Sequence, residues 1–288
     1  MARRDSGILA DHDITALIEA GAIDVPRPLD DRQVQPASLD LRLGEVAYRV
    51  RASFMPGAAH TVEDKLSQFE LHRIDLREGA VLETGCVYIV PLLEGLALPA
   101  AVAAAANPKS STGRLDIFTR VIADHAVEFD KVPAGYRGPL FLEVSPRTFP
   151  IVARTGSRLT QIRFRRGQAT LDAETLTALH DAETLVADER PNISQSGIAL
   201  SVDLTGDRDG LVGYRGKRHT ALVDVDGPGA HDVLDYWEPV HVRARKELIL
   251  DPDQFYILVS REAVHVPPLY AAEMTPFDPL VGEFRVHY

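Results

Sequence analysis

Short apolar runs divided by Pro and Gly fill the chain from Val34 to Phe164. Many of these runs contain β-branched or aromatic residues, and most are too short for a helix, so the pattern favours strands. Ala100–Ala106 has the helical propensity of an alanine run, but Pro99 and Pro108 bracket it. We predict a turn and a buried strand there, and a barrel or roll of strands for the region as a whole.

Helical periodicity is confined to two other segments. Residues 11–20 place Ile14, Leu17 and Ile18 on one face and end at a glycine, which predicts a short helix. A second helix is predicted over residues 171–186, where it joins two domains. The predicted division is therefore a first domain at 1–170, a linking helix within 171–190 and a second domain at 191–288.

Composition and charge narrow the class of protein. The 288 residues are 45% hydrophobic and 25% charged, which is enough for one large or two medium domains. A net charge of −11 argues against nucleic acid or an anionic membrane as the main partner. No apolar run has transmembrane length, and the first residues lack the apolar stretch of a secretory signal. The single cysteine, Cys86, excludes a disulfide scaffold, and we predict a cytoplasmic protein.

A candidate phosphate site follows the predicted alanine-rich strand. Asn107-Pro108 forms a turn, after which Ser110 or Ser111 is a suitable N-cap for a short helix. Ser110 and Arg114 are four residues apart and share one face of that helix. Free backbone N–H groups, two hydroxyls, Lys109 and Arg114 together form a group that favours phosphate. We call Lys109–Arg114 the phosphate cradle.

A candidate catalytic carboxylate lies further along. The glycine-rich turn Gly135–Gly138 leads into an apolar strand with one carboxylate, Glu143. Because side chains alternate along a strand, Phe141 and Glu143 face one side. From the residues alone, two interpretations of Glu143 are open: a partner in a structural ion pair, or a catalytic acid or base.

These segments resemble the dCTP deaminases of the dUTPase-like superfamily. In that family a Ser-Ser-x-x-Arg segment holds the triphosphate, and a Pro-Gly-Trp-x-Gly turn precedes the strand with the catalytic Glu. Ser110–Arg114 matches the first motif, and Gly135–Gly138 matches the second, with Tyr136 in place of Trp. Gln35–Gly44 and Thr155–Ile162 look like the family's N-terminal and closing strands.

The resemblance covers roughly residues 8–166 and departs from the family at one position. The family commonly has an Asp directly before the Pro-Gly of the turn, where this chain has Pro133 followed by Ala134. Asp130 lies three residues earlier and is the nearest replacement through a longer loop. The contribution of that Asp to sugar recognition is therefore left unassigned in this chain.

The resemblance implies a mainly β fold, a dUTPase-like distorted barrel or β-clip roll with few short helices, assembled as a homotrimer with sites between subunits. It implies conversion of dCTP and water to dUTP and ammonia, supplying dUTP for thymidylate synthesis, with dTTP as a possible inhibitor. It assigns catalysis to Glu143. The residues that it assigns to substrate binding are Lys109, Ser110, Ser111, Arg114, Tyr136, Phe141 and Gln161.

The chemistry supports one route to deamination over another. Attack at C4 of cytosine needs an activated water, a proton relay to ammonia and donors for the developing charge. Zinc deaminases use a His/Cys-x-x-Cys set with a separate Glu, and this chain has one cysteine and no His-x-Glu. We therefore predict that Glu143 takes the proton from water, that no zinc takes part, and that Mg²⁺ is bound with the triphosphate.

A weaker copy of the first half follows the second predicted helix. Ser201–Leu204 repeats the Ser-x-Asp-Leu pattern of Ser38–Leu41, and Phe255–Leu258 resembles Val87–Val90. Aligned on this second match, the cradle falls on Phe277–Gly282, which contains neither serine nor arginine. The counterpart of Glu143 would fall beyond the last residue. We predict two tandem copies, of which the second is a degenerate scaffold, incomplete at its C-terminal end.

Other functions remain open from the residues. A dUTP pyrophosphatase, or a bifunctional dCTP deaminase and dUTPase, would use the same fold. A non-catalytic nucleotide-binding regulator would explain the degenerate second copy. The basic segment Gly213–His219 is either a solvated loop or a loop that closes over the phosphates.

Overall fold

The computed structural model describes residues 6–188, 190–195, 197–245 and 247–275. The chain forms two compact units. The first unit holds the chain up to residue 169 together with residues 219–231, and the second holds 170–218 and 232–274. Residues 219–231 thus belong to the first unit although both flanks belong to the second, which the division predicted from the sequence does not anticipate.

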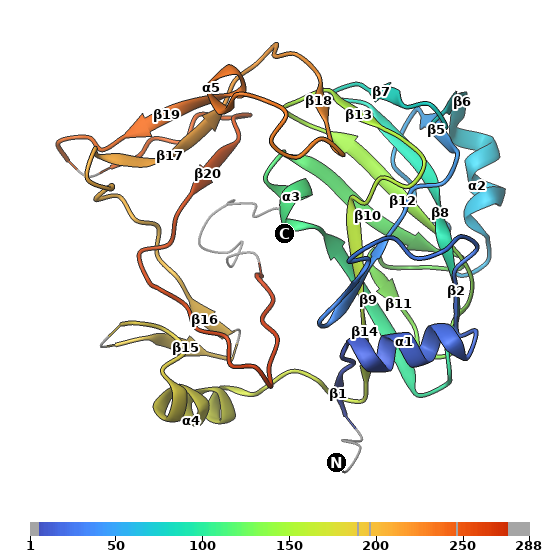
Figure 1. The fold of residues 1–288 in the computed structure, drawn as a ribbon, viewed down its shortest axis with the longest axis horizontal. Coiled ribbons are helices and arrows are strands. Elements are labelled where there is room, and N and C mark those ends of the chain that lie inside the picture. Colours follow the sequence, from blue (N-terminus) through green and yellow to red (C-terminus); the bar gives the residue numbers. More distant parts are fainter. Residues whose placement is uncertain (1–5, 189, 196, 246, 276–288) are drawn as a thin grey trace. The chain divides into compact units, whose positions relative to one another are not determined.

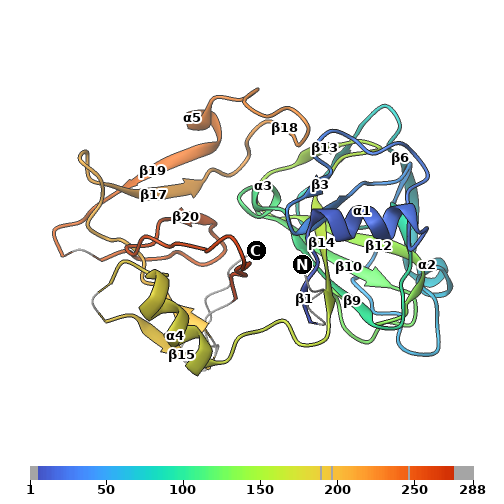
Figure 2. The same cartoon turned by 60° about the horizontal axis from the view of Figure 1, so that its bottom comes forward.

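The described part of the chain is mainly β with a few short helices, as predicted (Figure 1). The helices are α1 (Asp11–Glu19), α2 (Val62–Phe69), α3 (Ser110–Gly113), α4 (Ala173–Glu183) and α5 (Val233–Tyr236). In α1 the predicted positions Ile14 and Leu17 are buried, and the helix contacts β2, β3 and β4 (Figure 2). None of the described helices is long and apolar enough to cross a membrane.

The first sheet of the first unit has the strand order β11-β9-β14-β4-β3, with β1 pairing along β14. Its strands are β1 (Gly7–Ile8), β3 (Val34–Gln35), β4 (Ser38–Leu41), β9 (Val102–Pro108), β11 (Lys131–Val132) and β14 (Thr160–Arg166). Strand β9 confirms that the proline-bracketed alanine run is extended and not helical. The cradle therefore starts where β9 ends, next to the start of β14.

The second sheet has the order β10-β12-β8-β5-β6, with β2 pairing along β8. Its strands are β2 (Ile23–Asp24), β5 (Val46–Val50), β6 (Glu70–Asp75), β8 (Val87–Ala97), β10 (Ile117–Ala123) and β12 (Arg137–Pro146). Strand β12 lies between β10 and β8, antiparallel to both, so Glu143 sits on an interior strand opposite Arg120 of β10 and Ile89 of β8. A small third sheet has the order β18-β13-β7. Its strands are β7 (Ala80–Leu82), β13 (Ile151–Ala153) and β18 (Val223–Asp224).

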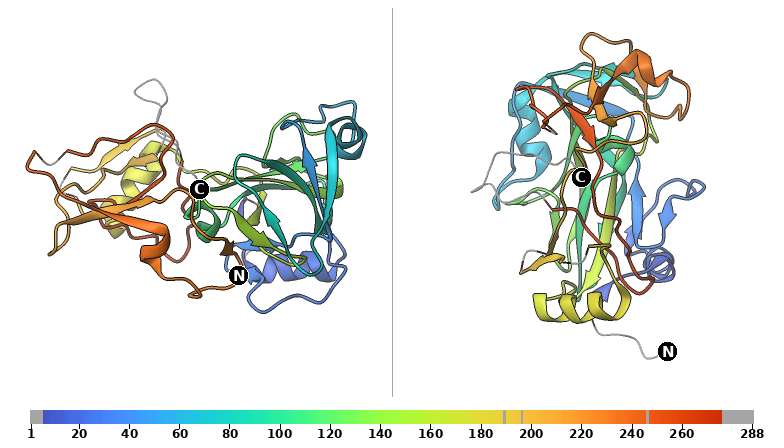
Figure 3. Two further views of the ribbon diagram at one scale, coloured as in Figure 1. Left: turned by 90° about the horizontal axis from the view of Figure 1, so that it is seen from above. Right: turned by 90° about the vertical axis from the view of Figure 1, so that its left-hand side faces the viewer.

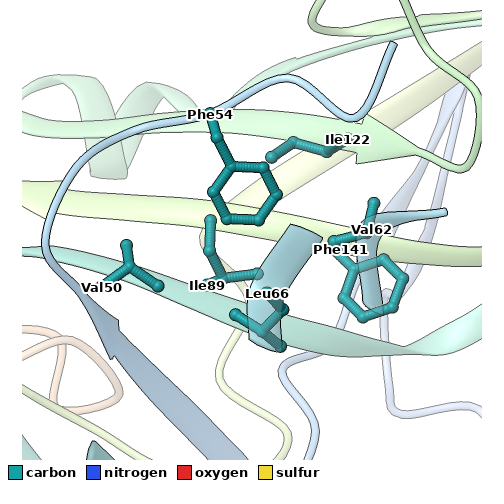
Figure 4. Close-up of a cluster of buried hydrophobic side chains, with 7 residues drawn as sticks. All are labelled: Val50, Phe54, Val62, Leu66, Ile89, Ile122 and Phe141. Atoms are coloured by element: carbon teal, nitrogen blue, oxygen red, sulfur yellow. The ribbon is translucent and has the colours of Figure 1, made fainter. Parts of the chain in front are cut away.

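Helix α2 and the chain before it cover the face of the second sheet that bears Phe141 and Glu143 (Figures 3 and 4). The apolar cluster there consists of Val50, Phe54, Val62, Leu66, Ile89, Ile122 and Phe141. The N-terminus of α2 is fixed by a capping box, in which Thr61 and Asp64 exchange side-chain and backbone hydrogen bonds. Asp124 also accepts a hydrogen bond from the Val62 N–H, at 2.8 Å. This helix places an apolar layer over the candidate catalytic strand.

The second unit contains α4, α5 and two small sheets, β15-β16 and β19-β17-β20. Its strands are β15 (Asn192–Ser194), β16 (Gly197–Ala199), β17 (Leu211–Gly216), β19 (Trp237–His241) and β20 (Tyr256–Leu258). Ser38–Leu41 is a fully buried strand, whereas Ser201–Leu204 makes only an isolated bridge at Val202. The tandem copies, like the dUTPase-like barrel, stay predictions, and Phe277–Gly282 lies outside the described residues.

Candidate active site

Glu143 lies on β12 with only 1% of its surface exposed. Its Oε1 accepts two hydrogen bonds from Arg120, from Nη2 at 2.6 Å and from Nε at 3.0 Å. Its Oε2 is buried and has no hydrogen-bond partner within the described part of the chain. A buried, unpaired carboxylate oxygen is costly, so it marks a position where a ligand or water is expected. One oxygen is thus held by an arginine, and the other is available for a proton.

Arg120 is held in place from several sides. Its guanidinium lies 3.6 Å from the ring centroid of Phe129 and 4.8 Å from that of Phe118, and its Nη2 donates to Ser53 Oγ at 2.8 Å. Cation–π contacts and hydrogen bonds together fix the guanidinium beside Glu143. The sequence analysis missed Arg120, although it is the only charged residue of β10.

Asp130 is a second carboxyl group near this pair. It is partly buried, adopts a left-handed backbone with φ of 62°, and accepts a 2.7 Å hydrogen bond from the Val121 N–H. Burial raises the pKa of Asp130 to about 7, the nearby Glu143 raises it slightly, and the Val121 hydrogen bond and Arg120 oppose the shift. Asp130 is therefore tied to β10, and its use as the replacement for the family's missing Asp stays a prediction.

The raised pKa of Asp130 predicts a pH dependence of stability. Below about pH 4 the carboxyl is protonated in both folded and unfolded chains; between pH 4 and 7 only the folded chain keeps the proton. Stability is therefore lost as the pH rises to about 7. Asp130→Asn keeps the acceptor for Val121. The free energy of unfolding of this variant, relative to that of the unchanged protein, should increase by about 2 kcal/mol from pH 5 to pH 8 in urea unfolding. An equal difference at both pH values would contradict this.

Helix α3 forms the cradle, but it begins one or two residues earlier than predicted. Lys109, not a serine, occupies the N-cap position and makes no side-chain capping hydrogen bond. Its extended backbone follows Pro108, and its carbonyl accepts from the Gly113 N–H, so the serines become the first two helical residues. Ser110 and Ser111 are exposed, and neither hydroxyl is hydrogen-bonded within the described residues. Arg114 is exposed too, and its Nε donates to the Ser110 carbonyl at 3.2 Å.

A buried carboxylate supports the cradle from β4. Asp40 is 1% exposed and forms an ion pair with Lys109 Nζ, while Arg158 Nη1 lies 3.7 Å from the same Oδ2. On the adjacent strand, Gln161 Oε1 accepts from Ser38 Oγ at 2.9 Å, so the Gln161 amide nitrogen keeps its donors. Lys109 and Gln161 are thus brought to one end of the first sheet, with the charge of Lys109 largely balanced by Asp40.

Tyr136 and Phe141 have structural contacts in the described chain. The Tyr136 hydroxyl donates to the Pro139 carbonyl at 2.6 Å and accepts from the Asp124 N–H at 3.1 Å. Burial raises the pKa of Tyr136 to about 12. Gly138, with φ of 157°, passes so close to this hydroxyl that a Cβ would lie 2.7 Å from it. Phe141 belongs to the apolar cluster under α2 (Figure 4). Contacts of Tyr136 and Phe141 with substrate stay predictions.

The structure gathers the predicted residues into two groups. Glu143 belongs to the second sheet, whereas Lys109, Ser110, Ser111, Arg114 and Gln161 lie at the end of the first sheet. Among the described residues, no hydrogen bond or ion pair joins Glu143 to this second group. Nor does any cluster of three or more His, Cys, Asp or Glu side chains suited to a metal ion occur there.

The basic segment Gly213–His219 is not a free loop. Its first four residues belong to β17. Arg215 pairs with Glu238 and Asp251, Lys217 Nζ donates to the Leu234 carbonyl, and Arg218 donates to the Asp253 carbonyl. The three cations are held inside the second unit, and the expectation of a basic loop at Gly213–Gly216 is wrong because the sequence there forms a paired strand.

Comparison with known proteins gives matches along nearly the whole chain. The model of the 2'-deoxycytidine 5'-triphosphate deaminase (DCD) N-terminal domain matches residues 5–168, and that of the C-terminal domain matches residues 171–288. A crystal structure of 2'-deoxycytidine 5'-triphosphate deaminase from Agrobacterium tumefaciens is 68% identical, with a TM-score of 0.94, over 99% of this chain and 85% of that one.

Curated relatives match about half of the chain. A dCTP deaminase, dUMP-forming, of Beutenbergia cavernae is 32% identical over 160 residues, which are 55% of this chain and 79% of the relative. A dCTP deaminase of Halorubrum lacusprofundi is 33% identical over 161 residues, 54% of this chain and 76% of the relative. The first name gives dUMP as the product, and the second names no product.

Proposed function

Because the chain belongs to the 2'-deoxycytidine 5'-triphosphate deaminase family, we propose that it hydrolyses the amino group from C4 of dCTP and forms dUTP and ammonia. The observation that carries the chemistry is the buried carboxylate of Glu143, with Oε1 bound to Arg120 and Oε2 without a partner among the described residues. A carboxylate so held has one oxygen directed by the protein and one left for the reacting water.

In the proposed mechanism, Glu143 Oε2 takes a proton from a water molecule as its oxygen bonds to C4. Glu143 passes this proton to N3 of the base, then takes the second proton from the new C4 hydroxyl and gives it to the amino nitrogen, so that the C4–N bond breaks and ammonia leaves as the C4 carbonyl forms. Arg120 stays bound to Oε1 throughout and holds the carboxylate in position. The apolar layer of Phe141 and its neighbours limits water around the carboxylate, which strengthens these charge interactions.

The triphosphate is assigned to the cradle. Ser110 and Ser111 offer free hydroxyls, and Arg114 offers an exposed guanidinium that can bind phosphate oxygens in a bidentate manner. Gln161 offers amide donors nearby, and Lys109 contributes less because Asp40 already balances its charge. Mg²⁺ belongs to the substrate as the magnesium complex of the triphosphate. dTTP, which carries the same triphosphate, is an expected inhibitor of this site.

The two groups of residues lie in different sheets of one chain, which bears on assembly. We place the complete site between subunits of a homotrimer, with Glu143 from one chain and the cradle from another. The family resemblance supports this arrangement, since it implies trimers with shared sites.

Loss of Arg114 should weaken substrate binding without removing the catalytic group. In an inactive Glu143→Gln background, Arg114→Ala should raise the Kd for dCTP roughly tenfold to a hundredfold, because one charged hydrogen-bond donor to phosphate is removed. Calorimetry measures this directly. Arg77→Ala is the control, since Arg77 is an exposed arginine that pairs with Asp75 away from the cradle. An unchanged Kd would remove Arg114 from the phosphate site.

The same two substitutions test the shared site. If Arg114 and Glu143 act from different subunits, mixing and reassembling Arg114→Ala chains with Glu143→Gln chains should restore part of the turnover. No recovery in mixed trimers would place both residues in the same chain's site.

Two other functions compete with the proposal. A pyrophosphatase, or a bifunctional enzyme, needs a carboxylate to direct water at the α-phosphate. Asp124 and Asp130, which precede the turn in the sequence, each accept a hydrogen bond from a backbone N–H. A non-catalytic regulator would bind dCTP unchanged. We expect incubation with dCTP and Mg²⁺ to release ammonia and dUTP in equal amounts. dUMP with pyrophosphate would support the bifunctional enzyme, and unchanged dCTP the regulator.

A further inference from the structure

Residues 219–231, which we call the strap, are built into the first unit by backbone hydrogen bonds. Strand β18 of the strap pairs in parallel with β13 (Figure 1). The Val223 N–H donates to the Pro150 carbonyl at 3.0 Å, and the Val225 N–H donates to the Val152 carbonyl at 3.3 Å. The strap therefore extends the third sheet by one strand and has a defined register.

Two carboxylates of the strap bind one arginine of the first unit. Arg154 Nη1 and Nη2 donate to the two oxygens of Asp224 at 2.8 and 2.9 Å, and Nη1 also donates to Asp226 Oδ2 at 2.8 Å. This fork geometry is the strong form of an arginine–carboxylate pair. The interaction lowers the pKa of Asp224 to about 2 and raises the pKa of Arg154.

Asp226 also reaches a buried serine in the turn that follows β13. Ser157 is 1% exposed, and its Oγ donates to Asp226 Oδ2 at 2.5 Å while accepting from the Arg154 N–H at 2.9 Å. The turn is closed onto Leu43, whose carbonyl accepts from Gly156 and whose N–H donates to the Ser157 carbonyl. Asp226 of the strap thus accepts a side-chain hydrogen bond that helps to fix this turn.

The turn leads to the phosphate cradle within two residues. Arg158 lies 3.7 Å from Asp40, the carboxylate that pairs with Lys109. The Leu159 carbonyl accepts from the Lys109 N–H at 3.1 Å, at the N-cap of α3. A shift of the Ser157 turn would therefore move the start of α3 and the start of β14, where Gln161 lies.

We propose that Asp226 is a positioning residue for the triphosphate cradle, supplied by the strap and acting through Ser157. This inference rests on the proposed function, because it assigns the cradle to dCTP binding. Asp226 does not touch substrate in this proposal. Glu143 lies on β12 in another sheet, so the strap affects substrate binding and leaves the chemical step largely unchanged.

The test compares Asp226→Ala, Ser157→Ala and the double substitution in the full-length protein. Each single change should raise the KM for dCTP about tenfold, with kcat within about twofold. The double substitution should raise KM little more than either single substitution does, because both single substitutions remove the same hydrogen bond. Asp226→Asn keeps an oxygen acceptor for Ser157 and should stay within about threefold of the original KM.

Two further readouts separate positioning from general damage. Asp188→Ala is the matched control, since Asp188 pairs with Arg261 in the second unit at 3.5 Å. It should leave KM unchanged. Hydrogen–deuterium exchange should accelerate at residues 107–114 and 155–162 in Asp226→Ala, and not in Asp188→Ala.

The outcomes distinguish the two claims. If the unchanged protein does not release ammonia from dCTP, the proposed function fails, and the exchange data still decide whether Asp226 orders the cradle. An unchanged KM with unchanged exchange in Asp226→Ala overturns the inference. A fall in kcat with KM unchanged, or equal effects in Asp188→Ala, overturns it too.

Discussion

Glu143→Gln is expected to reduce dCTP turnover about a thousandfold or more, because a general base of this kind contributes roughly 10²- to 10⁴-fold and the amide cannot accept the proton. The change is nearly isosteric. The carbonyl oxygen of the introduced amide can keep the hydrogen bonds that Arg120 now gives to Oε1, and the amide nitrogen occupies the place of Oε2. Single-turnover kinetics with saturating dCTP measure the loss.

Binding provides the control for this prediction. The cradle lies in α3 at the end of the first sheet, and no hydrogen bond or ion pair among the described residues links it to Glu143. The Kd for dCTP of Glu143→Gln should therefore stay within about threefold of the KM of the unchanged protein. Near-normal turnover in Glu143→Gln would place the base elsewhere.

Arg120→Met is expected to lower both the free energy of unfolding and the activity of the protein. Glu143 would lose its ion-pair partner while remaining buried, a change that costs about 3–5 kcal/mol for a fully buried pair. Arg120 keeps 26% of its side chain exposed, so we expect about 2–3 kcal/mol in urea unfolding at pH 8. Activity should also fall, since the two hydrogen bonds from Arg120 that hold Glu143 Oε1 in position are lost.

A double substitution checks the cause of this loss. Arg120→Met with Glu143→Gln removes the charge that was left unpaired and should recover at least about half of the lost stability. Ser53→Ala is a further control, because it removes only one neutral hydrogen bond of Arg120. If Arg120→Met unfolds at the same urea concentration as the unchanged protein, the ion pair does not hold Glu143 in place.

Local signals in the sequence predict the elements whose formation depends on residues that are close together in the chain. The apolar stripe of Ile14 and Leu17 predicts α1, and the prolines around the alanine run predict β9. Helix α2 was missed, although Thr61 and Asp64 form a capping box at its start and Val62 and Leu66 are its buried apolar positions. The N3 position of this capping box is Asp64, where Glu or Gln is usual, and the helix is only eight residues long. The signal in the sequence is therefore weak.

The site is less predictable because its key contacts join distant residues. The cradle and Glu143 follow from short motifs, but the pairing of Glu143 with Arg120 depends on the register between β10 and β12. The pairing of Lys109 with Asp40 depends in the same way on the order of strands in the first sheet. The contact between the strap and the turn is even harder to predict, since Asp226 and Ser157 are 69 residues apart in the chain. Neither periodicity nor propensity encodes such contacts.

The position of an isotope label tests the central claim most directly. dCTP and Mg²⁺ are incubated with the protein in H₂¹⁸O, and the products are resolved by mass spectrometry. Hydrolytic deamination by a water that Glu143 activates predicts one ¹⁸O atom in the uracil base of dUTP, one ammonia per label, and neither product in Glu143→Gln. Label found only on a phosphate, or base label formed equally well by Glu143→Gln, would contradict the account.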